Sequence, residues 1–226
     1  MHLTIFNGSP RRKRSNSSIL TDWFVEGFIE DSSNKVQVLY LAGTLDFLKH
    51  LEAFAYSENI IIIFPLYTDS MPAIVKKFLE NVFTYPGLAG KHVGFIVQSG
   101  FPESIHSSFV KRYLDKFAER MHWKYKGTVV KGGVEGIQIM PPALTGKLHR
   151  RFHRLGKYYA DNRIFDPKVV NDLAKPYRLS QGKQFMFRLM GVVGFSNYYW
   201  NKKLKENNAF TKRFDQPYKT VYSNKI

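Results

Sequence analysis

Residues that could bind a phosphate stand together near the start of the chain. Gly8-Ser9-Pro10-Arg11 is followed by three more cations and then by Ser15-Asn16-Ser17, directly before a helical pattern. Exposed N–H groups and the dipole at a helix N-terminus favour a phosphate. The alternative is a solvated basic loop in which Ser15 or Asn16 caps the helix. The stretch lacks the Gly-Lys-Ser/Thr of a Walker A loop and the Gly-x-Gly-x-x-Gly of dinucleotide-binding folds.

Two later loops could face a flat ligand. The first is Pro65-Leu66-Tyr67-Thr68-Asp69-Ser70-Met71-Pro72, in which a proline at each end restricts the backbone. Its N–H and C=O groups could meet a heteroaromatic edge, and Tyr67 could lie against a ring face. The second is Gln98-Ser99-Gly100-Phe101-Pro102, where Gly100 lets the backbone approach a ligand closely. Each loop could also be an ordinary turn, and for the loop around Gly100, taken alone, a turn is the preferred interpretation.

These loops follow strands in an alternating pattern. We expect strands over 2–6, 36–41, 59–64, 92–97 and 127–134, and helices over 17–30, 45–54, 103–121 and 143–160, with one more opened by Pro72. The run 59–64 is apolar without alternation, as in a strand covered on both faces. The pattern predicts an α/β fold with a doubly wound, mostly parallel sheet. Ligands bind such sheets beyond the carboxyl ends of the strands, where the three loops would meet.

The helix over 103–121 is expected to bury a stripe formed by Ile105, Phe109, Tyr113 and Phe117, joined by Val110 and Leu114. In the helix over 143–160 the expected apolar stripe is Leu144, Leu148, Phe152, Leu155 and Tyr159, opposite a cationic face. His149 and His153 share that helix at a spacing that metals can use. Since no cysteine or acidic residue accompanies them on the helix, no metal site is predicted.

The combined loop motifs resemble those of the flavodoxin-like NAD(P)H-dependent FMN reductase and quinone reductase family. The resemblance rests on Gly8-Ser-Pro-Arg…Ser15-Asn-Ser with Pro65-Leu-Tyr-x-Asp-Ser-Met-Pro…Lys77-Phe-Leu-Glu80, and it covers about residues 1–160. It implies a sheet of order 2-1-3-4-5, bound FMN, NADH or NADPH as co-substrate, and a homodimer. It also implies three groups of flavin-binding residues. The phosphate group is Ser9, Arg11, Ser15, Asn16 and Ser17; the ring group is Pro65, Leu66, Tyr67, Thr68, Asp69 and Ser70; the bordering group is Ser99, Gly100 and Phe101.

The composition of the chain excludes several kinds of site and several classes of protein. The chain has 226 residues, no cysteine and a net charge of +16. The absence of cysteine excludes disulfides, thiolate metal sites and the iron–sulfur relatives of the family. The first residues do not have the order of a signal peptide, so a cytoplasmic protein is expected. Residues 163–226 carry 13 Lys+Arg and 4 Asp+Glu, net +9.

We therefore predict a flavodoxin-like FMN-binding domain over 1–162 and a basic, aromatic-rich extension over 163–226 that packs on the core or on a dimer partner. The predicted activity is hydride transfer from NAD(P)H through flavin to a quinone-like or other small acceptor, with no catalytic side chain assigned. One alternative is a flavodoxin-type electron carrier, although such carriers are usually acidic. The other is a flavin-free module whose basic tail binds membrane or nucleic acid; a peripheral membrane contact stays open, and no nucleic-acid motif is present.

Overall fold

A computed structural model of the chain describes residues 1–43, 47–192 and 197–216. The chain forms two compact units, Met1–Arg178 and Leu179–Ile226. The first unit contains the sheet and every predicted flavin-binding residue, whereas the described residues of the second contain two short helices.

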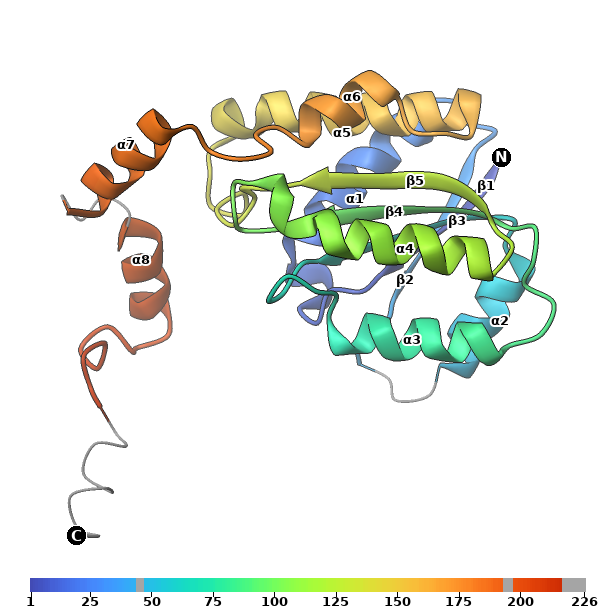
Figure 1. Cartoon of the computed structure of the whole chain (residues 1–226), viewed down its shortest axis with the longest axis horizontal. Helices are drawn as coiled ribbons and strands as arrows, with labels where there is room; N and C mark the ends of the chain where they lie inside the picture. Colours follow the sequence, from blue (N-terminus) through green and yellow to red (C-terminus); the bar gives the residue numbers. More distant parts are fainter. Residues whose placement is uncertain (44–46, 193–196, 217–226) are drawn as a thin grey trace, which may run out of the picture. The chain divides into compact units, whose positions relative to one another are not determined.

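The first unit is built on a parallel sheet of five strands in the order β2-β1-β3-β4-β5 (Figure 1). This order confirms the predicted flavodoxin-like topology. Every residue of β3 and β4 is buried, because helices cover both faces of the sheet. The strands in chain order are β1 (His2–Asn7), β2 (Lys35–Tyr40), β3 (Asn59–Pro65), β4 (His92–Gln98) and β5 (Lys124–Lys131).

Two layers of helices enclose the sheet. In Figure 1, α5 and α6 lie above the sheet and α3 and α4 below it. Two apolar clusters fill the layers, one on each face of the sheet, because residues of one strand point alternately to the two sides. The helices are α1 (Asn16–Phe28), α2 (Leu48–Tyr56), α3 (Ala73–Thr84), α4 (Ser108–Arg120), α5 (Pro142–Asn162) and α6 (Pro167–Leu173), with 3₁₀ turns η1 (Arg12–Arg14) and η2 (Ser104–Ser107).

Helices α1 and α5 touch backbone to backbone through two glycines. A Cβ atom at Gly27 would lie 1.9 Å from the carbonyl oxygen of His153, and one at Gly156 would lie 1.9 Å from that of Phe24. Real Cβ atoms do not approach so closely, so only glycine permits this crossing. The contact fixes α1, whose first turn carries Asn16 and Ser17.

Three expectations about individual elements are wrong. The fifth strand begins at Lys124 and ends at Lys131, because Gly133 has a φ of 73° and turns the chain out of the sheet. In α4 the buried stripe is Val110, Leu114 and Ala118, whereas Phe109 and Tyr113 are 66% and 44% exposed. Both rings were expected in the stripe; α4 is instead turned so that its smaller apolar residues meet β5. In α5, Leu144 is exposed and the next residue, Thr145, is buried, so the first turn directs Thr145 and not Leu144 inward.

The first unit extends to Arg178 and not to Asn162, the predicted limit. Phe165, Val169 and Leu173 are buried in the cluster beneath α1 and α5. The ring of Phe165 lies on the strand surface, where a Cβ at Gly94 would be 2.8 Å from it. Asp166 accepts hydrogen bonds from the N–H groups at the start of α6 and pairs with Arg154 at 2.9 Å. Residues 165–173 are therefore part of the core.

The second unit contains α7 (Gln181–Val192) and α8 (Tyr198–Glu206). None of the helices within the described residues has the length and apolar character needed to cross a membrane. Packing of residues 179–226 on the core or on a dimer partner stays a prediction.

Candidate functional site

The three predicted loops meet at the carboxyl ends of β1, β3 and β4, where they enclose a small polar cleft of about 30 Å³. The segment that follows β5 closes one side of it. The cleft is lined by Ser9, Arg11, Ser15, Asn16, Pro65, Leu66, Tyr67, Gln98, Ser99, Gly100 and Glu135. Nine of these eleven residues belong to the predicted flavin-binding groups.

The first loop presents the N-terminus of α1 to the cleft. Ser15 caps the helix: its Oγ accepts a hydrogen bond from the Ser18 N–H at 3.1 Å and donates one to the Arg12 carbonyl at 2.6 Å. Within the described part of the chain, the N–H groups of Asn16 and Ser17 have no hydrogen-bond acceptor. Ser15 therefore caps the helix, as one of the two interpretations of the sequence predicted, and the N–H groups of Asn16 and Ser17 remain available for an anion.

Among the four consecutive cations, Arg11 is the one that lines the cleft. Its Nη2 donates a hydrogen bond to Oε1 of Gln138 at 3.2 Å. Arg12 has a φ of 51° and turns away, so that its guanidinium packs against Gly43. The structure thus separates one guanidinium at the cleft from the other cations of the loop.

Two buried amides beside the cleft have unsatisfied atoms. Asn16 donates through Nδ2 to the carbonyl of Val134 at 2.8 Å, and its Oδ1 is buried with no partner. Asn7 accepts from the Ser9 N–H at 3.0 Å, and its Nδ2 is buried with no partner. Each such atom costs about 1–3 kcal/mol of folding free energy unless something satisfies it.

The second loop has two parts: the residues up to Tyr67 line the cleft, and the residues after it form a turn outside the cleft. Tyr67 and Ser70 exchange both backbone hydrogen bonds, and Thr68 and Asp69 have φ values of 50° and 58°, which defines a type I′ turn. Pro65, Leu66 and Tyr67 line the cleft, whereas the turn places Thr68, Asp69 and Ser70 outside it.

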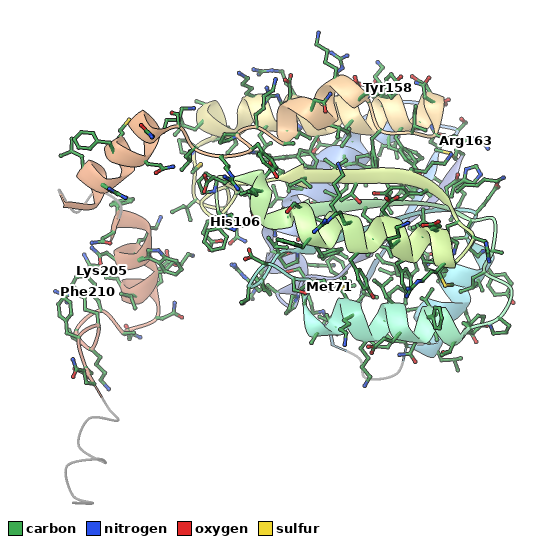
Figure 2. The ribbon with its side chains drawn as sticks, viewed as in Figure 1. Met71, His106, Tyr158, Arg163, Lys205 and Phe210 are labelled. Atoms are coloured by element: carbon green, nitrogen blue, oxygen red, sulfur yellow. The ribbon has the colours of Figure 1, made fainter. Side chains whose placement is uncertain are left out.

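Asp69 and Phe101 meet at His106, which lies in η2 (Figure 2). Oδ1 of Asp69 is 3.2 Å from Nδ1 of His106, and the ring of Phe101 contacts the same imidazole in a tilted arrangement, with the ring centres 4.8 Å apart. Phe101 therefore packs on the neighbouring turn and does not line the cleft, although Ser99 and Gly100 do.

Ser17 lies outside the cleft as well. It is fully buried, and its Oγ accepts a hydrogen bond from Nε2 of Gln98 at 3.2 Å. Gln98 in turn lines the cleft. The Ser17 side chain thus holds the end of β4 against α1.

The segment 132–140 was not among the predicted site residues. Glu135 lines the cleft, and a Cβ at Gly100 would lie 3.2 Å from its Oε2. Gln138 contacts the first loop twice, by accepting from Arg11 and by donating to the Arg14 carbonyl at 3.1 Å. The sequence contained the signal: Gly132-Gly133 follows a parallel strand, and the carboxyl ends of all parallel strands reach the same edge.

The histidine pair on α5 has partners on α1. His149 contacts Glu26 at 2.5 Å and His153 contacts Glu30 at 3.2 Å. Over residues 1–43, 47–192 and 197–216, no three His, Asp or Glu side chains are grouped as a metal site would require. The histidines join two helices of the scaffold.

A half-buried cation, Lys131, lies next to the segment 132–140. Desolvation by burial, together with the charge of Arg151, lowers the pKa of Lys131 at the end of β5. Its Nζ donates to the carbonyl of Gly132. Lys131 therefore supports the backbone at the point where the chain leaves the sheet.

Residues 1–150 match a family model described as a flavodoxin-like fold. No curated protein gives a significant match to the chain. The fold is also found among solved structures. An NADPH-quinone reductase from P. pentosaceus is 22% identical, with a TM-score of 0.55 over 72% of this chain and 99% of that one.

Two further structures resemble the chain to a similar degree. An NAD(P)H:quinone oxidoreductase from Methanothermobacter marburgensis is 18% identical, with a TM-score of 0.54 over 70% of this chain and 98% of that one. The general stress protein 14 of Treponema denticola, solved in complex with FMN, is 16% identical, with a TM-score of 0.52 over 71% and 97% of the two chains. Identities this low establish a shared fold, so the activity has to be argued from the residues of the cleft.

Proposed function

This chain belongs to the flavodoxin-like fold family that its first 150 residues match, and from that premise we propose that it is an FMN-dependent oxidoreductase. In this proposal it uses NADH or NADPH to reduce a quinone-like or other small acceptor. The observation that carries the proposal is the polar cleft at the carboxyl edge of the sheet, where Arg11, Ser9 and the first turn of α1 converge. The oxidoreductases among the structural relatives and the FMN complex of one of them support it.

The first loop fits the phosphate end of FMN. The free N–H groups of Asn16 and Ser17 and the guanidinium of Arg11 all favour an anion. Next to them, the unpartnered Oδ1 of Asn16 and Nδ2 of Asn7 supply one acceptor and one donor. We propose that Ser9, Arg11, Ser15 and Asn16 hold the phosphate, with the N–H of Ser17 contributing through the backbone.

The ring end of the cleft also has suitable groups but encloses little space. Leu66, Tyr67 and Gly100 offer backbone atoms and one half-exposed aromatic face, and Glu135 offers a carboxylate that can accept from a ring N–H. Because the cleft encloses only about 30 Å³, we propose that Gln138 releases the first loop when flavin binds, while the buried bond from Asn16 to Val134 stays in place. The contacts of Gln138 with Arg11 and Arg14 are exposed, so water can replace them at small cost.

The mechanism places little demand on side-chain chemistry. Bound flavin supplies the capacity to accept and donate a hydride, and the protein supplies binding, orientation and electrostatics. Arg11 and the α1 N-terminus hold the anionic end. The turn over Tyr67–Ser70 fixes the backbone along one edge, because each of its two end residues donates to the other. No side chain is assigned as an acid or base.

A homodimer is the assembly implied by the family resemblance, and we propose that it forms through the outer face of α3 and α4. Phe83 and Tyr113 are exposed there, beside a groove of about 530 Å³. Light scattering on the purified protein tests the assembly, and a monomer at micromolar concentration would count against it.

Anaerobic titration of the flavin-loaded protein with NADH and NADPH tests the proposed activity. The protein should bind FMN at about one per chain, lose its visible flavin absorption on addition of one nicotinamide nucleotide, and regain it with a quinone. Release of FAD on denaturation would refute the cofactor assignment. Bound FMN that neither nucleotide reduces would indicate an electron carrier, and failure to bind FMN would indicate a flavin-free module.

A further inference from the structure

The second compact unit, residues 179–226, has a composition unlike that of the first. It carries nine Lys+Arg and two Asp+Glu, net +7, together with ten aromatic residues. Basic excess of this density attracts anionic surfaces. We call these residues the tail segment; its described residues are 179–192 and 197–216.

Helix α7 presents an apolar ridge. Phe185, Met186 and Leu189 are 69%, 49% and 56% exposed. At about 100° per residue, these three side chains fall within an arc of about 100° on the helix surface. Arg188 lies about 60° to one side of Phe185, and Lys183 lies about 60° beyond Met186 on the other side. The ridge is therefore apolar at its centre and cationic at its margins.

Helix α8 combines rings with cations. Tyr198 and Trp200 stand exposed in its first turn, and Lys202, Lys203 and Lys205 follow. Lys203 pairs with Glu206 at 2.8 Å, and it is the one lysine of α8 with a carboxylate partner among residues 1–43, 47–192 and 197–216. Tyr and Trp have an apolar body and a polar end, which suits them to the boundary between hydrocarbon and water.

Beyond α8 the chain places more cations over rings. Nζ of Lys205 lies 5.0 Å from the ring centre of Phe210 (Figure 2). The guanidinium of Arg213 covers the same ring at 4.1 Å and that of Phe214 at 4.6 Å. Phe214 is nevertheless 79% exposed. Large apolar side chains thus stay in contact with water in α7, in α8 and at Phe214, which marks an interaction surface.

We propose that the tail segment binds the surface of an anionic phospholipid bilayer. The ridge of Phe185 and Leu189 would enter the boundary between headgroups and acyl chains, and the lysines of α8 would meet the lipid phosphates. Charge complementarity selects the occupant, since a +7 segment is attracted to an anionic leaflet and not to a second copy of itself. This inference is independent of the proposed flavin chemistry.

A single-stranded nucleic acid is the competing anionic partner, and the side chains of α7 argue against it. Nucleic-acid binding would use rings for base stacking and cations for phosphates. Met186 and Leu189 are aliphatic and offer neither, yet they lie beside Phe185 on the exposed ridge. An aliphatic ridge gains free energy only by leaving water for an apolar phase.

Vesicle flotation of the full-length protein tests the proposal. Vesicles of phosphatidylcholine with 30 mol% phosphatidylglycerol are compared with vesicles of phosphatidylcholine alone at about 0.1 M salt. The wild type should float with the anionic vesicles and stay in the soluble fraction with the neutral ones. Raising the salt concentration should weaken binding, because the attraction between the lysines and the lipid is screened.

Two double variants separate the apolar from the cationic contribution. Phe185→Gln with Leu189→Gln should lower the partition coefficient at least tenfold through the lost apolar burial. Lys202→Gln with Lys205→Gln should lower it about twenty-fivefold, at about fivefold per cation. The matched controls remove similar exposed side chains from the first unit. They are Tyr56→Gln with Leu144→Gln and Lys35→Gln with Lys49→Gln, and each should stay within twofold of wild type.

Several results would overturn the proposal. One is a wild type that remains soluble with both kinds of vesicle. Another is equal flotation of wild type and tail variants, or loss of flotation in the controls to the same extent. A third is tight binding to a single-stranded oligonucleotide that the tail variants abolish, without any vesicle binding. If the ridge variant aggregates, the Lys202 and Lys205 variant decides, because it removes no apolar core residue.

Discussion

The contact between α1 and α5 predicts the outcome of one substitution quantitatively. In Gly156→Ala the new Cβ would lie 1.9 Å from the Phe24 carbonyl oxygen and 2.9 Å from its carbon. Backbone atoms cannot rotate aside as a flexible side chain can, so the two helices have to separate by more than 1 Å. Overpacking of this kind costs about 1–3 kcal/mol and occasionally more.

The same helix contains a matched control. Gly146 also lies within α5, and a Cβ there would have only the Arg150 guanidinium within reach, at 3.5 Å. Gly146→Ala should therefore stabilise the protein by up to about 1 kcal/mol through helix propensity. Gly156→Ala gains the same propensity, so the difference between the two variants isolates the steric cost of the helix contact.

Urea unfolding followed by far-UV circular dichroism measures both variants. We expect Gly156→Ala to lower the free energy of unfolding by about 1–3 kcal/mol relative to Gly146→Ala. Because α1 carries Asn16 and Ser17 in its first turn, FMN affinity should fall as well. Equal midpoints for the two variants would refute the close backbone contact.

Three further predictions concern the cleft, the core and pH. Arg11→Ala should weaken FMN binding about tenfold to a hundredfold in a fluorescence titration, as expected for a charge-assisted hydrogen bond; Lys13→Ala should not, and equal losses would indicate general electrostatics. A chain ending at Asn162 should aggregate, because it lacks the buried residues of α6, whereas a chain ending at Arg178 should give a cooperative melt; a soluble, folded shorter chain would contradict this. Burial, assisted by the nearby cations of β5, lowers the pKa of His92, so the unfolded state binds the proton first. Stability should therefore fall as the pH drops below about 6.5, and His92→Gln should flatten that slope in urea midpoints measured from pH 5 to 7.

The sheet could be predicted from the sequence because its signals are local. The run over Asn59–Phe64 and the proline before α3 each fix an element without reference to the rest of the chain. The orientation of α4 could not be predicted, because Phe109 and Val110 are both apolar and only the packing against β5 decides which is buried.

The site residues also fall into two groups, those that a local sequence pattern predicts and those whose position depends on tertiary packing. Ser9, Arg11 and Asn16 follow a strand directly and were predicted to lie at the cleft, where the structure places them. Phe101 was expected there too, but its ring contact with His106 depends on a neighbouring turn that no local pattern describes. Glu135 was missed since its position depends on how the chain leaves β5.

The bond from Asn16 to Val134 joins residues 118 positions apart. Both contacts of Gln138 with the first loop span at least 124 positions. During synthesis the first loop and α1 therefore emerge long before their covering segment, and the cleft cannot close until about residue 140 has left the ribosome. Contacts of such long range are slow to form, because the entropy of loop closure is lost before they stabilise anything. The cleft should thus acquire its final form when β5 docks on the sheet. A nascent chain that stops before β5 should have four strands, and its first loop should lack the contacts with Val134 and Gln138.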